Sequence, residues 1–180
     1  MQFNNTPFNQ LFVIEPFRHS DSRGEFVKTY HTERFQHAGI QFELREEFFS
    51  VSKKDVLRGM HFQTPPFVHQ KFVYCTQGKI LDVVLDLRKS EPTYGKCFSI
   101  ELSALNRLML WIPIGFAHGF LSLTDESCVI YKTDREHAPS NDIGICWNSF
   151  GFAWQVQPKL LKLSPRDLQL PPFDSLQSPF

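Results

Sequence analysis

Residues 71–88, KFVYCTQGKILDVVLDLR, carry the strongest secondary-structure signal in this chain. Two runs rich in β-branched and aromatic residues, 71–76 and 79–88, flank the turn sequence TQG. This arrangement is typical of two strands joined by a tight turn. Alternate residues of the second run point to opposite faces, with Leu81, Val83, Leu85 and Leu87 on one face and Asp82, Val84 and Asp86 on the other. The alternation predicts strands rather than helices here.

Similar short runs continue on the C-terminal side of this pair. They are CFSIEL (97–102), LMLWIP (108–113) and CVIYKT (128–133), and turn sequences such as SEPTYG (90–95) separate them. Helix-period patterns are scarce. The one short candidate is TERFQHA (32–38), where Thr32 is the expected N-cap and Gly39 the expected end. Many short strands at this spacing predict an all-β sandwich or barrel.

Chain length and proline content indicate how the chain is organised. The 180 residues suffice for one compact domain with a substantial core, and no repeat or linker divides them. We therefore expect a single domain over residues 1–180. Prolines recur from about residue 158 onward, at Pro158, Pro165, Pro171, Pro172 and Pro179. This composition predicts an extended C-terminal tail that wraps the body of the domain.

The charge balance excludes some classes of partner. Lys and Arg together number 19, as do Asp and Glu, so the formal net charge is zero. A nucleic-acid-binding protein would carry a basic excess, so we expect no nucleic-acid partner. A net charge near zero also does little to oppose self-association. No apolar run reaches the roughly 18 residues of a transmembrane helix, and we expect no membrane partner.

The four cysteines, Cys75, Cys97, Cys128 and Cys146, are far apart, and none forms a C-x-x-C pair. The N-terminal residues do not have the pattern of a signal peptide. We therefore expect reduced, mostly buried thiols and a cytoplasmic protein. A secreted protein with two disulfides is the alternative.

The segment WIPIGFAHGF (111–120) resembles the second half-motif of cupin barrels, P-x-G-x-x-H. Pro113 and Gly115 make the turn between strands, and His118 then points into the barrel mouth. A turn histidine bonded to backbone is the alternative. The resemblance implies an all-β cupin, that is, a double-stranded β-helix jelly roll with short peripheral helices.

A metal-binding cupin would offer H-x-H and a nearby glutamate in its first motif. Here the corresponding stretch is His61-Phe62-Gln63, followed by His69, and no carboxylate occurs before Gly78. Lys71 would also place an ammonium beside any bound cation, which is unfavourable. His61 and His69 alone make a poor metal site, so we expect no metal.

A metal-free reaction fits these residue types better. Histidine can take a carbon-bound proton because its pKa lies near neutrality. Lysine can stabilise the enolate oxygen that then forms, and tyrosine can return a proton from the other face. Asp167, in LSPRD (163–167), is suited to orient His61 as a carboxylate orients a catalytic base.

Several motifs, in this order, resemble the dTDP-4-dehydrorhamnose 3,5-epimerase family, metal-free cupins that act on nucleotide-linked 4-keto-6-deoxy sugars. The motifs are DSRGEF (21–26), SVSKKDVLRGMHFQ (50–63), KFVYCTQGKILDVVLDLRKSEPTYG (71–95), IPIGFAHGF (112–120), YKT (131–133), GICWN (144–148) and LSPRD (163–167). The resemblance covers residues 11 to about 172. It implies an epimerase that needs no cofactor, binds a nucleotide sugar and forms a homodimer.

The resemblance also implies roles for individual residues. His61 would be the general base with Asp167 as its partner, Lys71 would stabilise the enolate, and Tyr131 would be the acid on the opposite face. Arg58 and His118 fall where the family holds the sugar and pyrophosphate. Arg23 and Phe26 match positions that reach the nucleotide, in the family from the partner subunit; a surface ion pair and a core phenylalanine are the alternatives. The remaining substrate-binding candidates are Lys28, Glu46, Phe48, Gln63 and His137.

Four of these positions depart from the family pattern. Lys28 stands where glutamate is usual in R-G-x-F-x-E, and Glu46 and Phe48 stand for glutamine and asparagine in Q-x-N-x-S-x-S. Because glutamate accepts hydrogen bonds and lysine only donates them, a nucleotide other than dTDP, such as CDP, is one hypothesis. Neutral change at a solvent-exposed rim is the other. His137 replaces a usual tyrosine, so single epimerisation at C3 or C5 is a further hypothesis.

Three rival functions accompany the epimerase prediction. A mono-epimerase or a 3,4-ketoisomerase on the same scaffold would use the same enolate. A sugar-nucleotide-binding protein without turnover is disfavoured because binding alone has no use for a general base. A metal-dependent cupin oxygenase or isomerase is disfavoured by the incomplete H-x-H motif.

Overall fold

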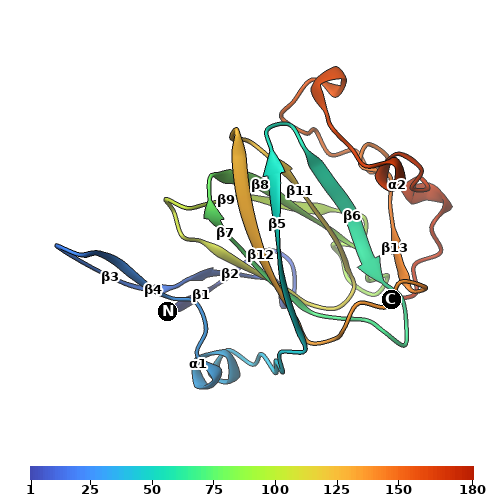
Figure 1. Ribbon diagram of the computed structural model, residues 1–180. Coiled ribbons are helices and arrows are strands. Elements are labelled where there is room, and N and C mark those ends of the chain that lie inside the picture. Colours follow the sequence, from blue (N-terminus) through green and yellow to red (C-terminus); the bar gives the residue numbers. More distant parts are fainter.

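The computed structural model describes all 180 residues, and strands dominate it (Figure 1). The elements in chain order are β1 (Gln2–Asn5), β2 (Phe12–Glu15), β3 (Phe17–Asp21), β4 (Gly24–Lys28), α1 (Thr32–His37), β5 (Glu46–Lys53), β6 (Leu57–Gln63), β7 (Lys71–Gln77), β8 (Lys79–Asp86), β9 (Cys97–Ser103), β10 (Met109–Ile112), β11 (Phe116–Ser122), β12 (Glu126–Thr133), β13 (Asp142–Gly144), η1 (Pro158–Leu160), α2 (Pro165–Leu168) and η2 (Phe173–Ser175). The all-β prediction is confirmed.

Two antiparallel sheets face each other and form a jelly roll. The six-stranded sheet has the order β1-β2-β10-β7-β12-β5, and the five-stranded sheet has the order β13-β6-β11-β8-β9. The space between them is filled by apolar side chains from both sheets, among them Val73, Ile80, Leu110, Phe120 and Val129. Tyr131 belongs to this inner core and also lines the polar cavity described below.

Part of the outer face of each sheet is also buried. On the five-stranded sheet Leu81, Val83, Leu85 and Leu87 pack against residues of the C-terminal segment. That segment runs over β6 and β13 in Figure 1 and includes short helices, so the tail is not uniformly extended. On the six-stranded sheet, Phe72 and Trp111 form a cluster with Phe35 of α1. The expected alternation of β8 is thus confirmed, with apolar residues required on both faces.

The N-terminal region departs from the expectations in two ways. Strands β1 to β4 were not predicted, because each is only four or five residues long and β3 is exposed along its whole length, so it has no hydrophobic alternation. Strands β3 and β4 pair only with each other and form a hairpin that projects from the body (Figure 1). The predicted cap Thr32 is wrong by one position: His31 is the N-cap of α1, and it has no side-chain capping bond.

A bulge in β6 aims its polar residues at one side. Side chains of a regular strand alternate, so Arg58 and His61 would point to opposite faces. The pairing with β11 shifts between His118↔His61 and Phe120↔Arg58, which gives β6 one extra residue. Gly59 has φ +120°, and a Cβ there would lie 2.6 Å from the Cα of Gly119. Only glycine fits this close approach. The bulge turns the side chains of Arg58 and His61 to the same side of the sheet.

All four cysteines are free; Cys75 is buried and the other three are half-buried. None of the helices is long and apolar enough to cross a membrane.

Candidate active site

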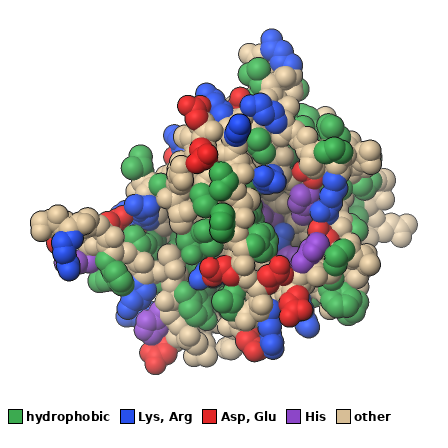
Figure 2. Space-filling model, in the orientation of Figure 1, with side chains coloured by type: hydrophobic (Ala, Val, Ile, Leu, Met, Phe, Trp, Pro, Cys, Tyr) green, Lys and Arg blue, Asp and Glu red, His purple; other side chains and the backbone are tan.

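A cavity of about 750 Å³ opens between the two sheets, beside the segment 162–167. Its size suits a small-molecule ligand. In Figure 2 histidine and basic side chains line a hollow in the surface, next to a band of exposed hydrophobic ones. Ten of the residues singled out from the sequence line this cavity: Glu46, Phe48, Arg58, His61, Gln63, Lys71, His118, Tyr131, His137 and Asp167. They come from segments spread over more than 100 residues of sequence.

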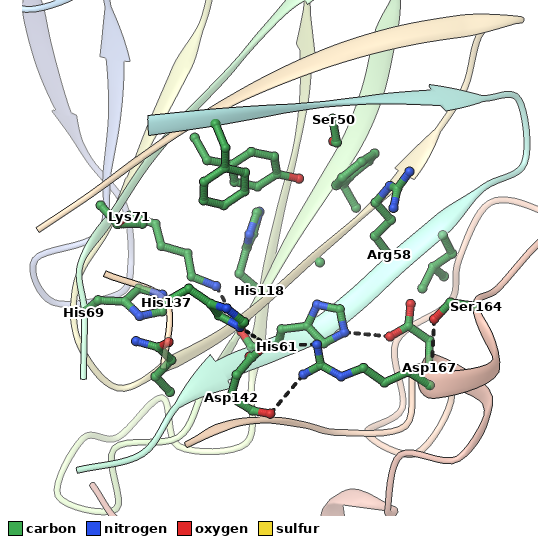
Figure 3. Close-up of a pocket in the computed structure, with 18 of the residues that line it drawn as sticks. Ser50, Arg58, His61, His69, Lys71, His118, His137, Asp142, Ser164 and Asp167 are labelled. Atoms are coloured by element: carbon green, nitrogen blue, oxygen red, sulfur yellow. Dashed lines mark hydrogen bonds and ion pairs between the residues drawn. The ribbon is translucent and has the colours of Figure 1, made fainter. Parts of the chain in front are cut away.

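His61 and Asp167 form a short polar contact in the cavity. His61 Nε2 lies 2.6 Å from Asp167 Oδ1 (Figure 3). An ionised carboxylate can only accept, so Nε2 carries the proton and donates it. The other ring nitrogen, Nδ1, is therefore left with a free lone pair. This is the tautomer that a general base needs.

Asp167 is fixed by the turn that carries it. Ser164 is the N-cap of α2, and its Oγ accepts a hydrogen bond from the Asp167 backbone N–H at 3.0 Å. Pro165 occupies the first helical position, which needs no N–H donor. Burial of Asp167 opposes ionisation, but the hydrogen bond and the charge of His61 hold the pKa of the carboxyl below its usual value. Asp167 therefore stays an anion.

Lys71 enters the cavity from the opposite sheet. It is the first residue of β7, and its Nζ donates to the His61 carbonyl oxygen at 3.2 Å. Burial lowers the pKa of Lys71 to about 8, although Asp142 and Asp82 favour its charged form. The Lys71 amine is thus mostly protonated at neutral pH, and the resulting ammonium is poorly shielded by water. Such a group interacts strongly with a developing negative charge.

Tyr131 is held between two aromatic neighbours. The Phe48 ring stacks on it with centroids 4.8 Å apart and an angle of 13° between planes, and His118 meets it edge-on at 6.0 Å. Burial raises the pKa of Tyr131 above its usual value. The phenol therefore keeps its proton at neutral pH and has one to give.

His118 is buried and tied to an aspartate. Its Nε2 lies 2.9 Å from Asp82 Oδ2, and both side chains are almost inaccessible to solvent. Sequence reasoning singled out His118 but not Asp82 as its partner. The available signal was that Asp82 falls on the inner face of β8, where a carboxylate needs a partner.

A second acidic centre, Asp142, was also missed. Its Oδ2 lies 3.1 Å from His137 Nε2 and 2.8 Å from an Arg166 guanidinium nitrogen. Burial raises the pKa of Asp142, but the bonds from Arg166 and His137 outweigh this effect and lower it. Arg166 belongs to the LSPRD motif, yet its role could not be assigned without its contact.

Three other lining residues are occupied by protein groups. The Glu46 carboxylate accepts the His137 backbone N–H at 2.6 Å. Gln63 accepts from the Ala138 N–H at 2.6 Å and donates to the Phe67 carbonyl at 2.7 Å. Arg58 Nε donates to Ser52 Oγ at 3.0 Å. Glu46 and Gln63 thus fix the loop that carries His137.

Arg23, Phe26 and Lys28 do not line the cavity of their own chain. They lie on the projecting β3–β4 hairpin, where the Phe26 side chain is 56% exposed. Arg23 pairs with Asp21 at 2.6 Å. The alternative that Phe26 is a core residue is therefore wrong within one chain.

The cavity also holds the two buried side-chain polar atoms without a hydrogen-bond partner, Ser50 Oγ and His69 Nδ1. No group of three or more His, Cys, Asp or Glu residues is arranged to hold a metal ion. Taken together, the cavity offers a base on one sheet and a protonated acid and an ammonium on the other.

Comparisons with known proteins agree with this chemistry. The family model described as dTDP-4-dehydrorhamnose 3,5-epimerase matches residues 5–175. The enzyme of that name from Escherichia coli (strain K12) is 39% identical, over 98% of this chain and 96% of its own length, and the one from Shigella flexneri is 40% identical, over 89% of this chain and 91% of its own. A solved structure of a dTDP-6-deoxy-D-glucose-3,5-epimerase from Legionella pneumophila, in complex with dTDP-4-keto-L-rhamnose, superposes with a TM-score of 0.93 at 31% identity, covering 97% of this chain and 94% of that one. The cupin-like jelly roll is confirmed, and this chain belongs to the dTDP-4-dehydrorhamnose 3,5-epimerase family.

Proposed function

We propose that this protein epimerises a nucleotide-diphosphate-linked 4-keto-6-deoxyhexose at both C3 and C5, as an enzyme of deoxysugar biosynthesis. One observation carries the proposal. His61 lies on β6 of the five-stranded sheet, and Tyr131 lies on β12 of the six-stranded sheet, yet both line the same cavity. Inverting a carbon centre requires removal of a proton from one face and delivery to the other. A sugar ring held between the sheets meets the base and the acid on opposite faces.

The reaction follows from these groups. His61 Nδ1 takes the proton from the carbon next to the C4 ketone, and the electron pair of the broken C–H bond moves to form an enolate. The Lys71 ammonium stabilises the charge on its oxygen. The Tyr131 hydroxyl then delivers a proton to the same carbon from the opposite face, and exchange with water restores both residues. C3 and C5 lie on either side of the C4 ketone in the sugar ring, so the same three residues serve both carbons.

Asp167 is a positioning residue in this scheme. Its carboxylate keeps the proton of His61 on Nε2 and stabilises the imidazolium that forms. Arg58 and His118 would hold the sugar and the pyrophosphate, and a guanidinium suits phosphate because it is planar and always charged. The reaction needs no group beyond the side chains of the chain itself.

Double epimerisation is favoured over inversion of a single carbon. The relatives compared above carry names that specify 3,5-epimerases. His137, which prompted the alternative, has its Nε2 engaged with Asp142. The ketoisomerase and pure binding functions have no observation in their favour.

We infer that the nucleotide is dTDP. Glu46 binds the His137 backbone and Phe48 stacks on Tyr131, so both departures from the family pattern have partners within the chain. Lys28 lies at the end of the exposed hairpin strand. Two of the three observations that motivated the hypothesis of a CDP sugar, those at Glu46 and Phe48, are thus accounted for within the chain.

We also infer a homodimer in the cytoplasm. The hairpin of one subunit would reach the cavity of the other and bring Arg23 and Phe26 to the nucleotide. The exposed phenylalanines support this arrangement, since Phe17 and Phe26 on the hairpin and Phe48 and Phe49 on β5 are each 45–67% exposed within one chain.

Deuterium wash-in tests the proposal. The protein is incubated with dTDP-4-keto-6-deoxyglucose in deuterium oxide, and C3 and C5 are followed by NMR with His61→Ala as the control. Deuterium at both carbons, absent with the variant, supports the double epimerase. Label at one carbon would show a mono-epimerase, and a 3-keto product would show a ketoisomerase. No label would overturn the proposal, and the CDP sugar would be tried next.

A further inference from the structure

His69 lines the cavity without a role in the scheme above. Neither ring nitrogen hydrogen-bonds to a protein group, and Nδ1 is buried. Leaving a buried polar atom unpaired is unfavourable, so such atoms usually have a partner. An imidazole without a protein partner in the lining of a cavity indicates that a polar ligand completes it.

The position of His69 relates it to the reacting carbons. It precedes Lys71, the first residue of β7, by two residues, and both side chains line the cavity. Figure 3 shows His69 beside Lys71 and His137, across the cavity from His61 and Asp167. Because Lys71 is proposed to bind the oxygen at C4, a group next to Lys71 lies near the substituents of C3 and C5, the two carbons that flank the ketone.

Those two carbons differ in polarity. In the proposed substrate, C3 bears a hydroxyl, whereas the far side of the ketone, C5, bears a methyl group. A polar ring with unpaired nitrogens suits the hydroxyl and not the methyl. We propose that His69 hydrogen-bonds the C3 hydroxyl of the sugar and is a specificity-determining residue of this cavity. This inference rests on the proposed function.

The charge state of His69 fits this role. Burial, followed by the charge of Lys71, lowers the pKa of His69 to about 3. The neutral ring has one donor and one acceptor nitrogen, so it can bind a hydroxyl in either sense. It also adds no second positive charge that would weaken the hold of Lys71 on the enolate.

Deletion of the hydroxyl from the substrate tests the contact. Exchange at C5 is followed in deuterium oxide with dTDP-4-keto-6-deoxyglucose and with its 3-deoxy analogue, so that the same carbon reports in both cases. We expect wild-type protein to favour the hydroxylated sugar by about tenfold in kcat/KM, the size of one hydrogen bond. In His69→Phe, kcat/KM for the hydroxylated sugar should fall by about the same factor, and the two sugars should be used equally.

Two further variants sharpen the test. His69→Gln keeps a donor and an acceptor and should restore part of the preference, and His69→Leu gives the comparison with a smaller side chain if the Phe variant does not fold. His37→Phe makes the same exchange on the exposed face of α1 and should retain the wild-type preference. A wild-type preference that persists in both His69→Phe and His69→Leu overturns the inference alone. Absence of exchange in the wild-type protein overturns the proposed function, and this inference with it.

Discussion

Phe48 lies flat against the ring of Tyr131, with centroids 4.8 Å apart and the planes inclined by 13°. The two residues are cross-strand partners in the pairing of β5 with β12. The stack covers one face of the phenol ring of Tyr131, which lines the cavity. A residue that departs from the family pattern is thus a support for the residue proposed to be the acid.

Phe48→Ala should therefore slow turnover. We expect kcat to fall by about threefold to tenfold, because loss of an aromatic pair worth about 1 kcal/mol frees the Tyr131 ring. Leu105→Ala is the control, since Leu105 is an apolar side chain that is 89% exposed and does not line the cavity. Steady-state kinetics with the parent sugar measures both variants. Equal effects from the two would show that the stack does not position Tyr131.

Tyr131→Phe separates proton removal from inversion. Without the hydroxyl the enolate can be reprotonated only from the His61 side, after His61 has exchanged with solvent. Deuterium should still enter the substrate, but the inverted product should be lost by at least two orders of magnitude. NMR of the recovered sugar reports label and configuration together. Inverted product at the wild-type rate would remove Tyr131 from the mechanism.

Asp167→Asn should be severely impaired although it changes little in shape. The amide can donate to His61 Nε2 and so stabilises the wrong tautomer, which turns Nδ1 from an acceptor into a donor. We expect kcat to fall on the order of 10³-fold, as in other histidines that lose their carboxylate. Asp174→Asn, an exposed residue of the same C-terminal segment, is the control. A loss of less than tenfold would mean that Asp167 does not orient the base.

The pH profile should show Lys71 on its alkaline side. The active form is the ammonium, and its pKa is about 8 in the free protein. The charged fraction is constant well below that value and falls as the pH rises through it. Thus kcat/KM, which reports the free enzyme, should drop about tenfold per pH unit above pH 8.

Lys71→Met should lose this alkaline limb together with most of the activity. Lys79→Met, at a partly exposed position of β8, should keep both. A profile that stays flat to pH 10 in the wild-type protein would show that the charge on Lys71 is not needed.

The sequence located most of the cavity through motifs, and its limits have a physical cause. His61, Lys71 and Tyr131 lie in segments that the family resemblance identifies, and strand alternation predicted which faces of β8 are apolar. Partnerships across strands could not be read in this way, because they depend on register. Phe48 and Glu46 suggested contacts to the nucleotide, yet pairing places them opposite Tyr131 and Thr133. Asp82 was missed for the same reason, since its partner His118 lies 36 residues away on the paired strand β11. Asp142 lies only five residues from His137, and their contact depends on the turn between them, which no periodicity predicts.

The β3–β4 hairpin provides the last prediction, because its residues lie outside the cavity of their own chain. Suppose that the hairpin of one subunit serves the cavity of the other. A mixed dimer of a cavity variant and a hairpin variant then carries both defects in one of its two sites and leaves the other site intact. His61→Ala and the double variant Arg23→Ala, Phe26→Ala should each have little activity alone. Denatured together and refolded, they should recover about a quarter of the wild-type activity, because half of the dimers are mixed and each holds one complete site.

A hairpin that served its own cavity would give no such recovery, since neither subunit would then hold an intact set. The solution mass of each refolded sample must also be twice the chain mass of 21.0 kDa. A monomeric mass with full activity would exclude the shared site. Recovery in the mixture, with a dimeric mass, would place Arg23 and Phe26 at the partner's cavity and explain why a hairpin with exposed aromatic rings projects from the sandwich.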